Sequence, residues 1–249
     1  MQNAKATSTP DADTPPEKKG ERRQVHEHVL SRMRRGLMIG AFLPGQVLSL
    51  RKLAAGLGTS PMPVREVLSR LVAAGALEET ANGSVAPPRL GPDKLEDLFS
   101  VREALEGMAA EMAARYATPA LIKELEAINA KLLAAIEKRD IAGCLSFNQE
   151  FHFTLYRGCR SEVILPLIEA LWLQFGPTMY MSLLVPSMPW NAADHGAILD
   201  ALKKGDRTAV KRGIVHDIRT TKRALLSVLG ENGMADLPFA ARSELFSDF

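Results

Sequence analysis

The chain has 249 residues, of which 46% are hydrophobic, 24% are charged and only 6% are aromatic. This length allows two domains with separate cores, and the composition is that of an ordinary soluble protein rich in helix. No uninterrupted apolar run reaches the roughly 18 residues that a membrane-spanning helix needs, and the N-terminus lacks the apolar core of a secretory signal. We therefore expect a cytoplasmic protein that begins with a disordered tail over residues 1–20.

The formal net charge is only +2, but the charges are distributed unevenly along the chain. Residues 21–90 contain ten basic and five acidic side chains, whereas residues 91–249 contain 18 basic and 21 acidic ones. The first segment therefore carries a net charge of +5 and the second a net charge of −3. This asymmetry is typical of a protein in which the N-terminal domain faces phosphates and the C-terminal domain does not.

Residues 48–78 contain two short helical patterns separated by a glycine turn at Gly58, which is typical of a helix-turn-helix. Ser60 and Pro61 mark the start of the second helix. Apolar residues then recur at helical spacing on one face: Val64, Val67, Leu68, Leu71 and Val72. The opposite face must be exposed, and it is the face that a DNA groove would meet.

Two short strand-like segments flank Asn82-Gly83, a dipeptide that strongly favours a β-hairpin turn. We interpret this hairpin as the wing of a winged helix-turn-helix domain over residues 21–86. The DNA-facing residues predicted from this arrangement are Arg51, Ser60, Met62, Arg65, Ser69, Asn82 and Gly83. Alternatively, Arg65 clamps a phosphate or pairs with a nearby acid. Phosphate contact and simple solvation both remain open for Arg22, Arg23, Arg34 and Arg35.

Three prolines and a glycine interrupt any regular structure at residues 87–92, which we predict to be a linker. Helical patterns follow at 93–116, 119–138, 141–157, 162–184, 191–204 and 207–229. The second domain, residues 93–230, is therefore predicted to be an all-α bundle of six or seven helices. Residues 231–249 form a tail without an assignable pattern, and the fold class is mainly α.

All three histidines after the linker lie in apolar rows of separate predicted helices: His152, His195 and His216. Asn148 lies one turn before His152 on the same face. A helical bundle can bring such side chains together in its core, and neutral imidazole is a preferred ligand of Zn²⁺ and Ni²⁺. Taken singly, a buried histidine is more often a hydrogen-bonded core residue than a metal ligand, so the pattern alone leaves both interpretations open.

Arg102 lies in the apolar row of the first helix of this domain. A buried guanidinium requires an anionic partner. Glu106, one turn further on, could supply it through a salt bridge. An anionic ligand held inside the bundle is the alternative, and the pattern does not decide between them.

Taken together, these residues resemble the GntR superfamily of bacterial transcription regulators, in the FadR-type branch whose helical ligand-binding domain is called the FCD domain. The resemblance covers residues 23–229. It is carried by PVREVL in the second helix, by the NGS wing, and by LEDLFSVREALEG, FNQEFHFTLYRGC, DHGAILDALKKGD and VHD in the helical domain. It implies an effector-responsive regulator, most often a repressor, that acts as a homodimer on a palindromic operator.

The resemblance further implies that His152, His195 and His216, with the residue at position 148, bind a divalent metal. Zn is the expected ion, with Ni or Mn as alternatives. A small organic acid then completes the site, and Arg102 holds its carboxylate bidentately. The family often has Asp at position 148, so the neutral oxygen of Asn148 makes an anionic effector more important for charge balance.

The recognition helix also departs from the family, because Pro61 and Met62 stand where many relatives have Arg and Thr. Arg65, with Met62 in apolar contact with a thymine methyl, must then provide more of the base recognition. Two other functions remain open: a sensor of metal alone, and a metal-dependent enzyme with a DNA-binding appendage. We expect no catalytic residue, because the inward faces that carry the histidines offer no evident general base.

Overall fold

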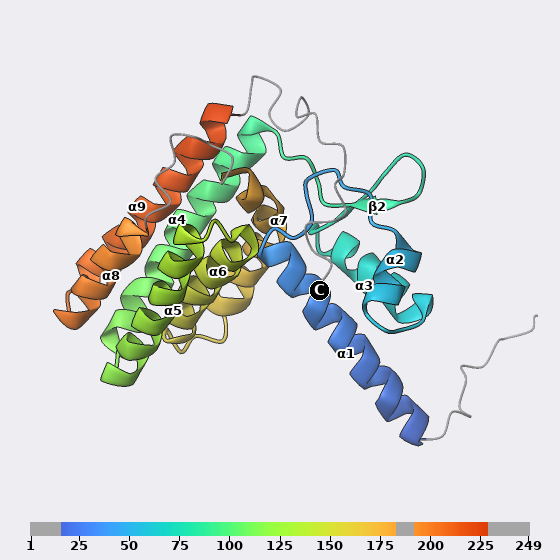
Figure 1. Ribbon diagram of the computed structural model, residues 1–249, viewed down its shortest axis with the longest axis horizontal. Coiled ribbons are helices and arrows are strands. Elements are labelled where there is room, and N and C mark those ends of the chain that lie inside the picture. The colour runs from blue at the N-terminus through green and yellow to red at the C-terminus, as the bar shows by residue number, and fades with distance from the viewer. Residues whose placement is uncertain (1–15, 183–191, 229–249) are drawn as a thin grey trace, which may run out of the picture.

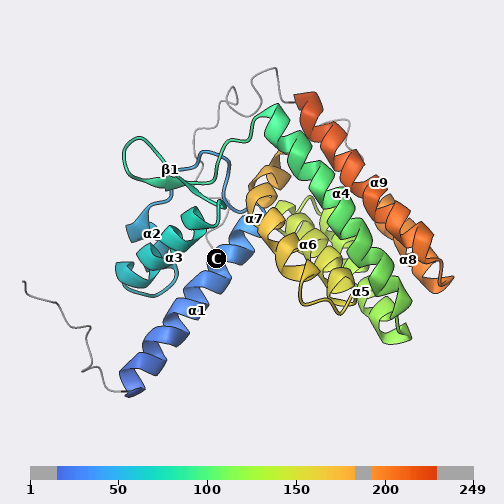
Figure 2. The same ribbon diagram turned by 180° about the vertical axis from the view of Figure 1, so that it is seen from behind.

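A computed structural model describes residues 16–182 and 192–228 of the chain. Figures 1 and 2 show two lobes, an N-terminal lobe with a small hairpin and a larger lobe made of helices. The first lobe contains α1 (Pro16–Met38), α2 (Leu50–Gly56), α3 (Pro61–Ala73), β1 (Glu78–Glu79) and β2 (Val85–Ala86). The second contains α4 (Pro92–Arg115), α5 (Pro119–Glu137), α6 (Ile141–Arg157), α7 (Ile164–Ser182), α8 (Ala193–Lys203) and α9 (Arg207–Val228). The predicted mainly α fold with a winged helix-turn-helix is confirmed.

The helix-turn-helix forms because its two helices begin and end at residues suited to those positions. The Ser49 hydroxyl accepts a hydrogen bond from the Lys52 amide (3.4 Å) and so caps α2. Gly58 then takes a left-handed conformation (φ +61°), which lets the chain reverse before α3. The apolar face of α3 packs against α1, and its buried residues are Val64, Val67, Leu68 and Leu71.

The wing is a two-stranded antiparallel hairpin, with Glu78 opposite Ala86 and Glu79 opposite Val85. Its turn closes through a hydrogen bond from the Gly83 amide to the Thr80 carbonyl (2.9 Å), and Gly83 has a positive φ of +71°. The hairpin predicted from Asn82-Gly83 is therefore present. It projects beyond α3 at the edge of the lobe (Figure 1).

In the helical lobe, each helix begins and ends within two residues of its predicted range. α4 packs along α9, α5 along α6, and α8 along α9. The predicted N-terminal tail extends too far, since α1 already begins at Pro16. The rest of that tail and the predicted C-terminal tail lie outside the described residues. None of the described helices combines the length and apolar character needed to cross a membrane.

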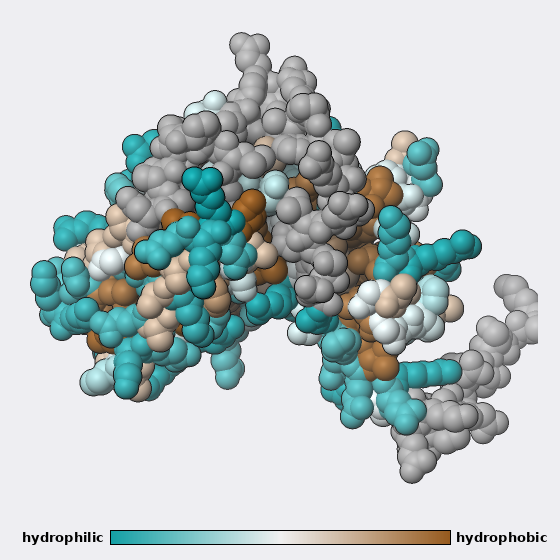
Figure 3. Space-filling model, viewed as in Figure 1, coloured by the Kyte–Doolittle hydropathy of each residue, from teal (hydrophilic) through white to brown (hydrophobic). Residues whose placement is uncertain are grey.

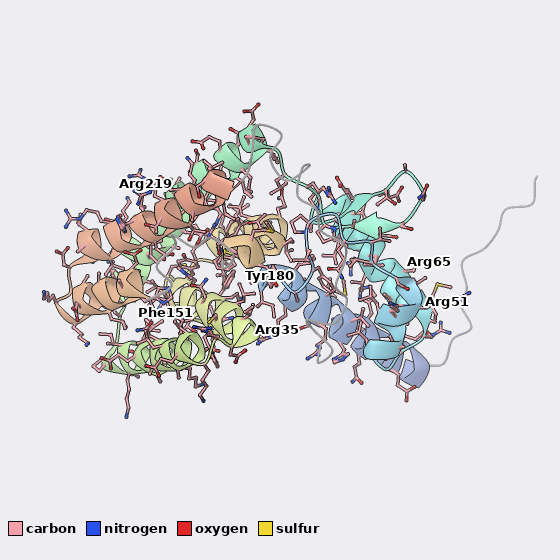
Figure 4. All side chains as sticks on the ribbon, turned by 45° about the horizontal axis from the view of Figure 1, so that its top comes forward. Arg35, Arg51, Arg65, Phe151, Tyr180 and Arg219 are labelled. Atoms are coloured by element: carbon pink, nitrogen blue, oxygen red, sulfur yellow. The ribbon has the colours of Figure 1, made fainter. Side chains whose placement is uncertain are left out.

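The two lobes meet where the C-terminal end of α1 packs against α7. Gly176 lies so close to α1 that a Cβ atom at this position would overlap the Leu37 carbonyl oxygen and approach Met38 Cα to 2.7 Å. Arg34 forms an ion pair with Glu169 of α7, and Arg35 donates a hydrogen bond to the Ser146 hydroxyl of α6 (2.8 Å). These two arginines therefore link the lobes, and Figure 4 shows Arg35 where the lobes meet. Neither phosphate contact nor simple solvation, the two alternatives that the sequence left open, describes this arrangement.

Candidate functional site

The outer face of α3 is free of cover from the described parts of the chain. Met62 is 61% exposed, and Arg65 and Ser69 are also exposed. Arg51 on α2 and Arg65 on α3 lie on the side of the N-terminal lobe that faces away from the helical lobe (Figure 4). The row predicted from helical spacing therefore has the accessibility that entry into a DNA groove requires.

The remaining predicted DNA-facing residues are exposed as well. Asn82 and Gly83 occupy the tip of the wing, and Ser60 precedes α3. Ser60 stands at the N-cap position, yet its side chain makes no capping hydrogen bond. Its hydroxyl is therefore available to a phosphate or a base edge.

A second candidate site lies inside the helical lobe, where His152 of α6, His195 of α8 and Asp217 of α9 converge. One ring nitrogen from each histidine and one carboxylate oxygen of Asp217 all lie within 4.8 Å of one another. His152 Nε2 is 3.3 Å from Asp217 Oδ2. The histidines are almost fully buried, at 1% and 2% exposed, and the Asp217 side chain is 22% exposed.

Burial and charge set the ionisation of this cluster. Burial, helped by the neighbouring His152, lowers the pKa of His195 from 6.5 to about 3, so its ring is neutral at physiological pH. Burial acts to raise the pKa of Asp217, but its contact with His152 outweighs this effect and leaves that pKa below its usual value. The site thus combines a neutral imidazole with an ionised carboxylate.

The structure does not bring His216, a predicted ligand, to this cluster. Its side chain is 63% exposed, and its Nδ1 lies 2.9 Å from Asp194 Oδ1. The expectation of an inward-facing His216 is wrong because the buried row of α9 runs through Val210, Ile214 and Ile218. Each residue turns about 100° around a helix, so Asp217 faces the core side where its neighbour His216 does not.

Asn148 lies one turn before His152 on α6 and is buried (8% exposed), as the sequence predicted. That its amide oxygen takes part in metal binding stays a prediction. The two cysteines, Cys144 and Cys159, are buried and not joined to each other. They therefore act as small core residues.

Arg102 and Glu106 form a buried salt bridge on α4. Arg102 Nε donates to Glu106 Oε1 (2.6 Å) and Nη2 donates to Oε2 (3.3 Å), with both side chains almost completely buried. We predicted that Arg102 holds the carboxylate of an effector through two hydrogen bonds. In the structure Glu106 accepts these two bonds, from Nε and Nη2 of the guanidinium. Only Arg102 Nη1 is left, buried and without a hydrogen-bond partner among the described residues.

Aromatic rings connect this arginine to the histidines. The Arg102 guanidinium carbon lies 3.9 Å from the ring centre of Phe175 and 5.1 Å from that of Trp172. The Trp172 ring in turn lies 5.6 Å from the His152 ring, and His195 stacks on Phe151 at 3.9 Å. Figure 4 shows Phe151 in the interior of the helical lobe. The arginine and the histidines therefore belong to one buried site.

Sequence reasoning missed three residues of this site: Asp217, Tyr156 and Trp172. Tyr156 could have been found, because it follows His152 by one helical turn. Asp217 is adjacent to His216 in the sequence. Predicting it as a site residue would have required knowing which side of α9 faces the core. Trp172 Nε1, like His195 Nδ1, is buried and has no hydrogen-bond partner among the described residues, which no sequence pattern reports.

The donor set fits a divalent metal. Two imidazole nitrogens and one carboxylate oxygen are the ligands found in zinc sites that keep one coordination position open for water or a ligand. His195 Nδ1 is a buried polar atom without a hydrogen-bond partner in the described part of the chain, so no described hydrogen bond at this atom competes with a metal for the ring. His152, His195 and Asp217 are thus the residues that could hold the ion, with Asn148 close in the sequence.

An exposed recognition helix and wing, attached to a separate helical domain with a buried polar site, are the features of a DNA-binding regulator. The model for bacterial regulatory proteins of the gntR family matches residues 25–85, and the FCD domain model matches residues 97–220. The chain belongs to the GntR family, in the group with an FCD domain. These families and the relatives below are transcription regulators and not enzymes.

Relatives of known name support this assignment. The chain is 32% identical over 174 residues to the HTH-type transcriptional regulator McbR of Escherichia coli, covering 69% of this chain and 79% of that one. It is 27% identical over 168 residues to a probable D-xylose utilization operon transcriptional repressor of Paenarthrobacter nicotinovorans, covering 67% and 74%. The solved structure of E. coli McbR/YncC superposes with a TM-score of 0.74 at 29% identity, covering 82% of this chain and 97% of that chain.

Proposed function

We propose that the helical domain binds a divalent metal and a small carboxylate, and that their binding changes the affinity of the N-terminal domain for its operator. Zn is the first choice of metal, with Ni or Mn as alternatives. The observation that carries the proposal is the convergence of His152, His195 and Asp217 in a buried site that also contains polar atoms of other side chains without a hydrogen-bond partner among the described residues.

Two of these unpaired atoms are hydrogen-bond donors that suit a carboxylate. Arg102 Nη1 and Trp172 Nε1 are both buried, and neither has a partner within the described residues. Leaving a buried donor unpaired costs about 1–3 kcal/mol. Both donors suit the carboxylate of a bound acid, so Arg102 would contribute through Nη1 and not through the edge that Glu106 occupies.

Charge balance also favours an anionic ligand. Arg102 and Glu106 cancel each other, His195 is neutral, and Asp217 supplies one negative charge. A bound divalent ion therefore leaves the buried site with an excess of one positive charge. A monocarboxylate would neutralise it, which makes a metal-and-acid sensor more favourable than a sensor of metal alone.

α7 offers a physical connection from this site to the DNA-binding lobe. On one side, Trp172 and Phe175 pack against His152 and Arg102. On the other side, Gly176 packs against the end of α1 with no room for a side chain. A ligand that shifts the aromatic side chains must therefore also move the surface on which α1 rests.

The proposed regulator is a cytoplasmic homodimer that binds a palindromic operator, since two-fold protein symmetry matches two half-sites. An exposed apolar row on α4, which contains Val101 and Met108, could contribute to the contact between protomers. On the face drawn in Figure 3, by contrast, brown areas are small and separated by teal side chains. Repression relieved by the effector is the proposed direction, because one relative is named a transcriptional repressor.

The proposal can be tested with operator DNA obtained by selection from a random duplex library. Fluorescence anisotropy would measure operator affinity with chelator, with zinc alone, and with zinc plus each of a panel of small carboxylic acids. We expect one class of acid to lower the affinity by about 5–150-fold, the range of typical allosteric coupling. An effect of equal size with zinc alone, or none with any acid, would contradict the proposal.

A matched variant connects the effect to the site. Trp172→Phe keeps the packing of a large aromatic ring but removes the Nε1 donor. It should weaken the response to the acid and leave DNA affinity without acid nearly unchanged. Trp190→Phe is the matched control, since it makes the same chemical change at the chain's other tryptophan.

A further inference from the structure

A line of buried polar contacts runs from the candidate metal site to the salt bridge on α4. His152 Nε2 faces Asp217 Oδ2 at 3.3 Å, while the other nitrogen of the same ring, Nδ1, lies 3.1 Å from the Tyr156 hydroxyl oxygen. The Tyr156 hydroxyl donates to Glu106 Oε2 at 2.7 Å, and Glu106 is held by Arg102. The line therefore joins three helices through five side chains.

The direction of the hydrogen bonds along this line follows from the number of protons available. The Tyr156 hydroxyl has a single proton, which it donates to Glu106 Oε2. Glu106 accepts two hydrogen bonds from Arg102 and is therefore an acceptor toward Tyr156. Since the tyrosine proton goes to Glu106, the tyrosine oxygen is left as an acceptor toward His152.

We propose that Tyr156 and Glu106 are positioning residues that hold His152 in the tautomer with its proton on Nδ1, which leaves the Nε2 lone pair directed at a divalent cation shared with Asp217. This inference rests on the proposed metal site. In that tautomer, Nε2 and Asp217 Oδ2 are two acceptors 3.3 Å apart, a pair of atoms that would suit a divalent cation. The contact through Nδ1 also fixes the orientation of the ring.

His195 provides an internal comparison. Its ring stacks on Phe151 with an interplanar angle of 8°, and its Nδ1 has no hydrogen-bond partner among the described residues. Packing holds this ring, but no described hydrogen bond selects its tautomer. The two histidines of the candidate site are therefore held differently, His152 by a hydrogen bond to its second ring nitrogen and His195 by packing. Loss of the Tyr156 contact should affect His152 alone.

The first test reads the tautomer directly in protein free of metal. Nitrogen-15 NMR of protein labelled at histidine distinguishes protonated from unprotonated ring nitrogens, and the His152→Gln variant assigns the signal. At a pH well above the usual histidine pKa, we expect the His152 proton on Nδ1. In Tyr156→Phe this preference should be lost, with the population moving toward the Nε2-protonated form.

Either of two NMR results would overturn the proposal: a His152 proton on Nε2 in the wild-type protein, or the same Nδ1 preference in Tyr156→Phe. Protonation of both nitrogens at that pH would also overturn it, because a proton would then occupy the place assigned to the metal. The wild-type spectrum alone gives a decision if Tyr156→Phe does not fold.

The second test measures zinc affinity by calorimetric titration. Loss of a contact that orients a metal ligand typically costs about 10–100-fold in metal affinity, and we expect this loss in Tyr156→Phe. Tyr116→Phe is the matched control, because it removes the hydroxyl of a tyrosine that is 39% exposed at the end of α4. Its zinc affinity should equal that of the wild-type protein.

The two tests separate this inference from the proposal on which it rests. Equal zinc affinity in the wild-type protein and Tyr156→Phe would overturn the positioning role and leave the metal site intact. A wild-type protein that keeps the Nδ1 tautomer but binds no zinc would overturn the metal site, and with it this role of Tyr156.

Discussion

The two candidate sites differ in how they are built. The DNA-facing surface depends on a single helix and a short hairpin, with Arg65 and Met62 on the open face of α3. The site in the helical lobe depends on side chains from separate helices that meet in the core, with His152, His195 and Asp217 each from a different one. An exposed row tolerates small errors in helix rotation, whereas a buried cluster of ligands does not.

The buried salt bridge on α4 should give the largest effect on stability. Glu106→Ala leaves the Arg102 guanidinium buried without its anionic partner, which typically costs about 3–5 kcal/mol. Urea unfolding followed by circular dichroism measures the loss. Glu126→Ala is the control, because Glu126 pairs with Lys203 at the surface and should contribute little. Equal losses in the two variants would contradict the account of a buried polar core.

Arg65 tests the exposed site in the same way. Arg65→Ala should weaken binding to the selected operator by about 1–3 kcal/mol if the side chain reads a base, with discrimination between operator sequences reduced. Thermal stability should not change, since the side chain is exposed. Arg157→Ala, which removes an exposed arginine from the helical lobe, should leave operator affinity unchanged. A uniform loss for all DNA sequences would instead assign Arg65 to a phosphate.

The junction of the two lobes is tested at Gly176. Gly176→Ala places a methyl group against Leu37 and Met38, and overpacking of this kind typically costs about 1–3 kcal/mol. We expect a lower melting temperature and an altered response of DNA binding to the effector. Gly196→Ala is the matched control, because nothing lies within 4 Å of a Cβ atom there. The control should be neutral or slightly stabilising. A neutral Gly176→Ala would contradict the close contact.

Two serines at neighbouring helix starts give the smallest expected effect. Ser49 caps α2, so Ser49→Ala should lower stability by about 1 kcal/mol. Ser60 makes no capping hydrogen bond, so Ser60→Ala should leave stability nearly unchanged and weaken operator binding. Chemical denaturation and anisotropy on both variants give the comparison. A larger loss of stability in Ser60→Ala than in Ser49→Ala would contradict the assignment of Ser49 as the capping residue and of Ser60 as a residue that contacts DNA.

The sequence predicted the fold well, because each helix carries its own spacing and its own punctuation. Pro119 and Asp140, for example, mark the starts of α5 and α6 within one residue. The same local information predicted the exposure of Arg65 and the burial of His152. Each of these two properties depends only on which face of a single helix packs against the core.

What could not be predicted depends on the packing of several helices. His216 and Asp217 are adjacent, so a rotation of one residue on α9 exchanges an exposed imidazole for a carboxylate that reaches the core cluster. The sequence also left open whether Glu106 or a ligand pairs with Arg102. The structure gives the bidentate contact to Glu106 and leaves the two N–H groups of Arg102 Nη1 without a partner among the described residues.

The most direct measurement is zinc binding by the wild-type protein, Asp217→Ala and His216→Ala, each titrated calorimetrically after removal of metal. The account predicts one zinc ion per chain in the wild-type protein, an affinity lower by about 100-fold or more in Asp217→Ala, and wild-type affinity in His216→Ala. Loss of zinc in His216→Ala with full binding in Asp217→Ala would contradict the assignment of the buried cluster as the metal site.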